Sequence, residues 1–278
     1  MLPLRKLFAF LDHRQGPPAR GGGRLDRRHI LSRWLAVTRR QIPLPALPAE
    51  WDGAAVAHLG DLHVGPICGL DYVRRIVEAV NAERPDVVVF TGDLVNNARA
   101  CGPELGQILA ALQARDAKLA VLGNHDCDAD PVAAAAVLAA GGFEVLHNDH
   151  RLLRRGAGAI CVAGVDDYRR GTADLDAALT GVGEDVPRIL LQHNPDYAAA
   201  LPPRPRVDLA LCGHTHGGQI ALPLLGPPLL SVHHRRYGAG LARNGRCLVY
   251  TTRGLGMVYL PIRWNCRPEL PVLTLRSL

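Results

Sequence analysis

Residues 86–93 read Asp-Val-Val-Val-Phe-Thr-Gly-Asp, and this stretch decides the kind of fold. Its apolar run is continuous rather than alternating, which is typical of a strand that is buried on both faces of a sheet. Such strands belong to largely parallel sheets that helices cover. The run stops abruptly at Gly92 and Asp93, so a carboxylate lies where the buried strand ends.

The same rhythm continues along the chain from Trp51 onward. Strand-like runs occur at AAVAHL (54–59), DVVVF (86–90), KLAVL (118–122), AICVAG (159–164), RILLQ (188–192) and VDLALC (207–212). Helical patterns lie between several of them, at 72–83, 103–115 and 131–140. After about residue 218 the helical patterns cease, and QIALPLL (219–225), CLVYTTR (247–253) and PVLTLR (271–276) are expected to be strands. The sequence therefore predicts an α/β front and a β-rich back.

Five of the predicted strands end in the same types of side chain. The ends read Asp61-Leu62-His63, Gly92-Asp93, Gly123-Asn124-His125-Asp126, His193-Asn194 and Gly213-His214-Thr215-His216. Open α/β sheets place their sites at the carboxyl ends of strands. Because all five ends carry Asp, Asn or His, they predict a metal site, and no cysteine joins the set. This chemistry favours manganese, iron, zinc, cobalt or nickel over a thiolate zinc site.

The number of these side chains indicates more than one ion. Seven ligands are too many for one tetrahedral ion but suit two ions that share a bridging carboxylate, roughly 3.5–4 Å apart. Two dications at that distance repel each other, and they need a bridging carboxylate and hydroxide between them. A pair of this kind can clamp an in-line displacement at phosphorus.

The ordered motifs D-x-H, G-D, G-N-H-D, H and G-H-x-H resemble those of the calcineurin-like metallophosphoesterase superfamily. The similarity extends over residues 38–278 to a bacterial phosphodiesterase-like sub-branch, through IPLPALPAEWDG (42–53), GHTHGGQ (213–219) and RGLGMVYLPIRWNCRPELPVLTL (253–275). The resemblance implies a four-layer α/β sandwich, in which two mixed β-sheets are flanked by helices. It also implies an enzyme that hydrolyses phosphoesters with metal ions.

The resemblance also implies roles for single residues. Asp61, His63 and His216 would hold one metal ion, Asn124, His193 and His214 the other, and Asp93 would bridge them. His125 would protonate the leaving oxygen or stabilise the transition state, and Asp126 would orient His125. Manganese is the first expectation for both ions, with iron, zinc, cobalt and nickel as alternatives.

Five further residues are candidates for contact with the substrate. They are Asn96, Asn97, Arg169, Arg170 and Arg253, for which turn and solvent-exposed loop positions are the alternative. Purple acid phosphatases place a tyrosine three residues after the bridging Asp, whereas this sequence has Asn96. A ferric-tyrosinate centre is therefore not expected.

The basic residues are unevenly distributed along the chain. The net charge is +6, and ten of the 32 Lys and Arg residues lie in the first 50 residues. We therefore expect a basic N-terminal arm at 1–50, either at a membrane surface or packed on its own protein, and a catalytic domain at 51–278. The seven cysteines include no C-x-x-C pair and are expected to be reduced. A cytoplasmic protein, with peripheral contact to the inner membrane as an alternative, fits better than export by a twin-arginine signal.

These observations lead to one expected function and two alternatives. We expect a dinuclear phosphodiesterase or pyrophosphatase, acting on a small phosphoester that is lipid-linked or nucleotide-linked, by in-line attack of a metal-bridging hydroxide. The alternatives are a nuclease of the same fold, which the few aromatic residues do not favour, and an inactive metal-binding scaffold. Residues 221–237 are either a buried strand with its turn or an exposed apolar lip with a basic rim that contacts an anionic lipid surface. The sequence leaves the oligomeric state open.

Overall fold

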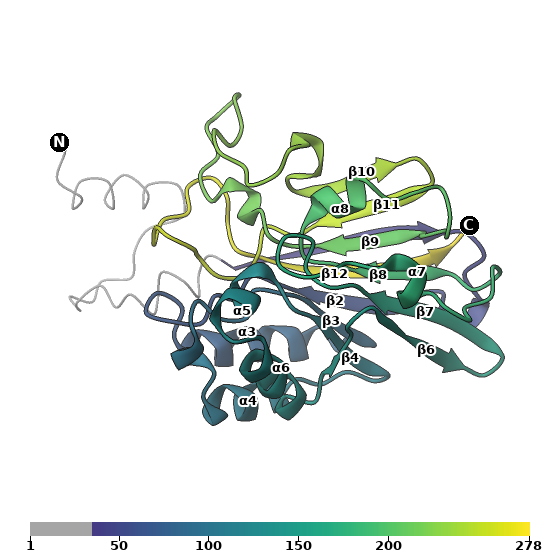
Figure 1. The fold of residues 1–278 in the computed structure, drawn as a ribbon, viewed down its shortest axis with the longest axis horizontal. Helices are drawn as coiled ribbons and strands as arrows, with labels where there is room; N and C mark the ends of the chain where they lie inside the picture. The colour runs from purple at the N-terminus through teal and green to yellow at the C-terminus, as the bar shows by residue number, and fades with distance from the viewer. Residues whose placement is uncertain (1–34) are drawn as a thin grey trace.

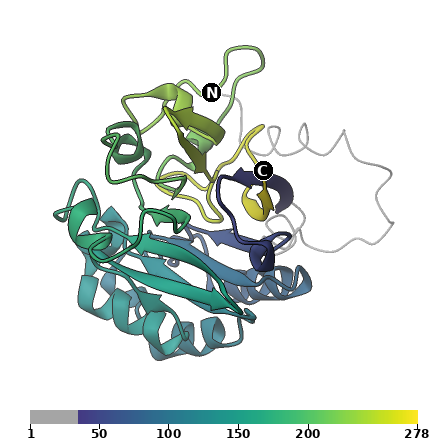
Figure 2. The ribbon, with the colours of Figure 1, turned by 90° about the vertical axis from the view of Figure 1, so that its right-hand side faces the viewer.

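The computed structural model describes residues 35–278, and in it two six-stranded sheets pack face to face with helices outside (Figures 1 and 2). The first sheet has the order β1 (Ala36–Leu44), β12 (Glu269–Ser277), β2 (Ala55–Leu59), β3 (Val87–Thr91), β4 (Ala117–Val121) and β5 (Glu144–Val145). The second has the order β10 (Gly240–Asn244), β11 (Cys247–Thr251), β9 (Leu209–Cys212), β8 (Arg188–Leu191), β7 (Gly158–Gly164) and β6 (Asp149–Arg155). Both sheets contain parallel and antiparallel pairs. The expected four-layer sandwich is confirmed.

The alternation of side chains along each strand separates three layers of core. Val87 and Val89 of β3 point into the core between the sheets, whereas Val88 and Phe90 point into the core under the helices. In the second sheet, Ile189 and Leu191 point inward and Leu190 points outward. Central strands with both faces buried explain why their sequences are continuously apolar.

The helices cover the outer faces of the sheets. Helices α3 (Leu70–Ala82), α4 (Pro103–Ala110) and α6 (Pro131–Ala140) cover the first sheet, on the lower side of Figure 1. The short helices α7 (Leu175–Ala178) and α8 (Pro195–Ala199) cover the second sheet. Helix α5 (Asn124–Ala129) begins at the end of β4, within one of the predicted motifs.

The expected boundary of the N-terminal arm at residue 50 is wrong. β1 pairs with β12 in parallel over nine residues, from Ala36–Glu269 to Leu44–Ser277, so residues 36–44 belong to the first sheet. β1 is an edge strand with exposed residues at its centre, which is why its sequence, AVTRRQIPL, lacks a continuous apolar run. The remainder of the expected arm, residues 1–34, lies outside the described residues.

Two further expectations about local structure have different outcomes. QIALPLL (219–225) is not a strand, because it forms only isolated bridges, from Ile220 to Trp264 and from Leu222 to Gly226. Pro223 within the segment cannot donate to a ladder, and Gly226 follows directly after it.

All seven cysteines are free thiols, and five of them are buried.

Candidate metal centre

Five strands deliver the predicted metal ligands to one edge of the sandwich. The segments that follow β2, β3 and β4 carry Asp61, His63, Asp93 and, at the first position of α5, Asn124. Those that follow β8 and β9 carry His193, His214 and His216. Six of these side chains are buried, and Asn124 is half-buried. The structure brings all seven together because the parallel strands of both sheets end at this edge.

The backbone at this edge is strained. Asp61, His63, Asp93, His214 and His216 all have positive φ, between 48° and 72°. Residues other than glycine adopt this left-handed region at a cost in free energy, and such residues cluster at functional sites. Here the conformation turns the backbone sharply after each strand and directs the side chains toward the same space.

The first cluster consists of Asp61, His63 and His216, whose ligand atoms lie within 4.8 Å of one another. The Nε2 atoms of His63 and His216 are 2.9 Å apart. The Nδ1 of His63 is 2.7 Å from the amide oxygen of Asn96, which can only accept a hydrogen bond. This nitrogen therefore carries the proton, and the Nε2 lone pair of His63 faces the site.

The second cluster consists of Asp93, His193 and His214. The Nδ1 of His193 donates to the carbonyl oxygen of Thr91 at 2.8 Å, which directs Nε2 of the ring into the site, toward Asp93. That Nε2 lies 3.1 Å from Nδ1 of His214. Both clusters thus have imidazoles whose orientation and tautomer are set by a neighbouring oxygen.

Asp93 connects the two clusters. Its Oδ2 is 3.4 Å from Nε2 of His63 and 3.1 Å from Nε2 of His193, while its Oδ1 accepts from the backbone N–H of His125 at 2.8 Å. Glycine makes this position possible, because a Cβ on Gly123 would lie 2.3 Å from Oδ1 of Asp93.

The buried polar atoms fit bound metal ions. Asp61 Oδ2, Asn124 Oδ1 and His214 Nε2 are buried and have no hydrogen-bond partner among the described residues. Unpaired buried polar groups are costly, and a cation would satisfy such an oxygen. The donors are oxygen and nitrogen only, as divalent transition metals accept.

Burial and charge shift the pKa values of these groups strongly in the metal-free protein. Burial raises the pKa of Asp61 to about 7 and lowers that of His63 to about 4. Burial also disfavours charge on Asp93 and His193, but their mutual attraction outweighs it. The pKa of His193 is therefore raised to about 10, and the pKa of Asp93 is lowered.

His125 lies beside the clusters, but Asp126 does not orient it. The His125 ring packs edge-on against His63 with centroids 4.8 Å apart, and no hydrogen bond joins it to another described side chain. Both oxygens of Asp126 accept from backbone N–H groups, of Leu94 and Val95 at 2.8 and 3.1 Å and of Gly123 at 3.1 Å. Asp126 therefore joins the loop after β3 to the start of α5, which corrects the expected role.

The five candidate substrate contacts are mostly engaged elsewhere. Asn96 holds His63, and Asn97 is exposed. Arg169 donates to Ser231 O at 2.7 Å, and Ser231 in turn donates to His214 O. Arg170 pairs with Asp128 at 2.7 Å, and Arg253 pairs with Glu269 at 3.2 Å. Arg169 is thus linked through Ser231 to the loop that carries His214.

The sequence analysis missed Arg263, a buried guanidinium behind the site. It donates to the carbonyl oxygens of Arg253 and Gly256 at 2.8 and 2.6 Å, and it lies 3.2 Å from Nδ1 of His216. It thereby fastens the loop 253–256 beneath Asp61, where Gly256 N donates to Asp61 O. An arginine between Pro261 and Trp264 gives no periodic signal of burial, so only the fold reveals this role.

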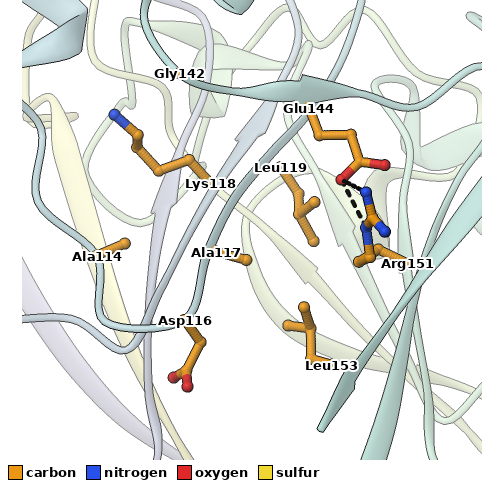
Figure 3. A pocket seen from close by; sticks show the side chains of 9 residues that line it. All are labelled: Ala114, Asp116, Ala117, Lys118, Leu119, Gly142, Glu144, Arg151 and Leu153. Carbon is orange, nitrogen blue, oxygen red and sulfur yellow. Dashed lines mark hydrogen bonds and ion pairs between the residues drawn. The ribbon is translucent and has the colours of Figure 1, made fainter.

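A separate hollow of about 450 Å³ lies at the start of β4, at the amino end of the strand (Figure 3). Its charged groups are already paired: Glu144 with Arg151 at 2.7 Å, and Lys118 with the carbonyl oxygen of Gly141 at 2.7 Å. The hollow therefore has no free polar group that points to a ligand.

Comparison with known proteins agrees with this geometry. Residues 54–218 match the model of the calcineurin-like phosphoesterases. The uncharacterized metallophosphoesterase YkuE of Bacillus subtilis is 34% identical, over 92% of this chain and 91% of its own length. Phosphodiesterase YaeI of Escherichia coli is 32% identical, over 79% and 81%. The solved NAD nucleotidase of Haemophilus influenzae shares the fold, with a TM-score of 0.51 at 14% identity, over 73% of this chain and 45% of its own.

Proposed function

The chain belongs to the calcineurin-like phosphoesterase family, and from this premise we propose that it cleaves phosphodiester or pyrophosphate bonds with two divalent metal ions. It is a metal-dependent phosphoesterase, a hydrolase. The similarity to a protein named as a phosphodiesterase supports a diester as the substrate class. Manganese is the ion we propose first.

The observation that carries the two-metal proposal is the position of Asp93. One oxygen of this carboxylate lies within 3.4 Å of a histidine from each cluster. Asp61, His63 and His216 would hold one ion, and Asn124, His193 and His214 the other, with Asp93 between them. A bound pair of ions would supply Lewis acidity, by neutralising phosphate oxygens and lowering the pKa of water.

The protein's own groups would orient the metal ligands, donate a proton and contact the phosphate. Asn96 and the Thr91 carbonyl hold two imidazoles in the tautomer that binds metal. The His125 ring, half-buried and free of hydrogen bonds to other described residues, can donate a proton to the departing oxygen. Arg169 lies at the rim, where its guanidinium can contact a phosphate oxygen.

The proposal is tested by the variant Asp93→Asn. The amide keeps the shape but loses the charge that two cations need between them. With excess Mn, hydrolysis of bis-p-nitrophenyl phosphate, a cyclic nucleotide and a nucleotide-linked lipid should fall at least about a hundredfold. Metal content, measured by atomic emission, should fall below two ions per chain.

The matched control is Asp149→Asn, at an exposed carboxylate on β6 outside the candidate site. This variant should keep full activity and both metal ions. Wild-type activity in Asp93→Asn at saturating Mn would refute the bridging role.

A further inference from the structure

Exposed apolar side chains gather on two loops next to the candidate metal centre. Of ten large hydrophobic residues exposed in the described part of the chain, six form what we call the apolar ridge: Leu224, Leu225, Leu229, Tyr259, Leu260 and Trp264. Leu224, Leu225, Leu229 and Tyr259 each expose at least 79% of their surface. Exposed apolar groups are ordinary when scattered, but a cluster of this kind marks an interaction surface.

The two loops are fastened together. Trp264 N donates to Gln219 O, and Ala221 N donates to Trp264 O, both at 2.9 Å. The Gln219 side chain bonds both the N–H and the carbonyl oxygen of Val258, at 2.9 Å each. These hydrogen bonds hold the two loops of the ridge together, so the loops do not move independently.

Hydrogen bonds also hold the base of the longer loop, which carries Leu224, Leu225 and Leu229. Arg235 donates to the carbonyl oxygen of Pro227, and Arg169 donates to that of Ser231. Figure 1 shows the segment after β9 running out from the body as a long loop. The ridge is thus held away from the hydrophobic core, with its leucines in water.

The ridge also borders the site. Gln219, which joins the two loops, lies three residues after His216. Tyr259, at the tip of the second loop, packs its ring against that of His125 with centroids 6.1 Å apart. Whatever covers the ridge is therefore next to the candidate catalytic groups.

The segment of the chain that carries the ridge contains charges of one sign. From Leu209 to Pro268 the sequence has seven arginines and no Asp or Glu. Five of these arginines are exposed: Arg235, Arg236, Arg243, Arg246 and Arg267. The carboxylate that faces this segment at Asp196 is buried and paired with His233 Nδ1 at 2.9 Å. The surface therefore suits an anionic partner.

We propose that the apolar ridge docks the protein on an anionic lipid bilayer, with the leucines inserted and the arginines facing lipid phosphates. Tyr and Trp are side chains typical of the bilayer interface. A second copy of the chain suits this surface less well, because a two-fold interface would place the same arginines against each other. Among the described residues no helix is long and apolar enough to cross a bilayer. The inference goes beyond the proposed chemistry and does not depend on it.

Vesicle binding tests the proposal. Full-length protein is sedimented with vesicles of phosphatidylcholine and phosphatidylglycerol, alongside the variant Leu224→Ser/Leu225→Ser/Leu229→Ser. We expect the wild type to bind, with weaker binding at high salt and on pure phosphatidylcholine. The triple variant should lose at least about a hundredfold in affinity.

The matched control is Val132→Ser/Leu278→Ser, which removes equally exposed apolar groups outside the ridge (78% and 84%). It should bind like the wild type. All variants should hydrolyse bis-p-nitrophenyl phosphate at the wild-type rate, so that a failure of docking and a failure of the proposed chemistry give different results. Brominated lipids should quench Trp264, and Trp264→Phe should abolish that part of the quenching.

Several outcomes would overturn the proposal. Binding of the triple variant equal to that of the wild type would assign vesicle affinity to another part of the chain, such as residues 1–34. Absence of binding by the wild type would remove the docking role. An oligomer that the triple variant converts to a monomer in sedimentation velocity would make the ridge a subunit interface.

Discussion

His125 differs from the four candidate ligand histidines in having no hydrogen bond between its ring and another described side chain. If its role is to protonate the departing oxygen, its removal should matter most where that oxygen is a poor leaving group. For His125→Asn, we expect kcat on an alkyl diester to fall about a hundredfold or more. On bis-p-nitrophenyl phosphate, whose leaving oxygen needs no proton, the fall should be less than about tenfold.

Metal content should stay unchanged in His125→Asn. An equal loss of kcat on both substrates would assign His125 to charge stabilisation instead of proton transfer.

His58 makes the stability of the metal-free protein depend on pH. It is fully buried on β2, with Nε2 2.9 Å from Thr91 Oγ1, and burial lowers its pKa to about 3. Below the ordinary histidine pKa of 6.5, this histidine is protonated in the unfolded chain but stays neutral in the folded protein. The free energy of unfolding should therefore fall as the pH drops from 6.5 toward 3, by about 1.4 kcal/mol per pH unit for this group.

The check compares urea unfolding of metal-free wild type and His58→Gln at about pH 7.5 and pH 5. Between these values the wild type should lose about 2 kcal/mol more than the variant. Because the other histidines titrate equally in both proteins, identical losses would contradict the assignment to His58.

At the scale of elements, the start of α5 depends on the absence of a side chain. Gly123 precedes this helix, and a Cβ there would lie 2.3 Å from Asp93 Oδ1 and 2.5 Å from Asp93 N. Gly123→Ala should therefore displace Asp93, lowering kcat and metal affinity by roughly a hundredfold. Gly69 is a matched control, since it occupies the same position before α3, with extended backbone and nothing within 4 Å of a Cβ.

Gly69→Ala should keep wild-type activity and lose no more than about 1 kcal/mol of stability. The measurements are steady-state rates across a Mn titration and thermal unfolding. Full activity in Gly123→Ala would show that the loop after β3 can move without cost.

Sequence patterns predicted those elements whose structure depends on local periodicity. The central strands, the helices over the first sheet and the loops that carry the ligands follow from continuous apolar runs and from what ends them. β1 was missed because an edge strand needs only one buried face and tolerates Arg39, Arg40 and Pro43. Strand order and register depend on contacts between distant segments, such as β1 with β12, which no local pattern encodes.

In the candidate site, too, the sequence predicted some features and could not predict others. Residue types and order pointed to the candidate ligands, and the structure places these residues at one edge. The groups that hold them could not be predicted, because they act across the fold: Asn96 on His63, Thr91 on His193 and Arg263 on His216. Asp126 shows the converse, since its place beside His125 in sequence suggested an orienting role that its contacts with three backbone N–H groups exclude.

At the scale of the whole molecule, the candidate ligands divide between the two sheets. The first sheet supplies Asp61, His63, Asp93 and Asn124, and the second supplies His193, His214 and His216. Bound ions would therefore cross-link the sheets at this edge. Chelation should lower the free energy of unfolding by about 2.7 kcal/mol, relative to metal at a hundred times its Kd. For a chain of this size that corresponds to a fall in Tm of roughly 5–10 °C.

The location of the change tests the cross-link more sharply than Tm alone. In hydrogen exchange, chelation should speed exchange at the ends of β8 and β9, where Gly213 N donates to His193 O at 3.0 Å. The β6–β7 hairpin, whose strand β6 is the outermost strand of the second sheet, should be unaffected. Asp93→Asn, which should not hold the bridged pair, is expected to show little response to chelator in either measurement. If chelation instead destabilised both proteins equally, the ions would stabilise a region other than the seam between the sheets.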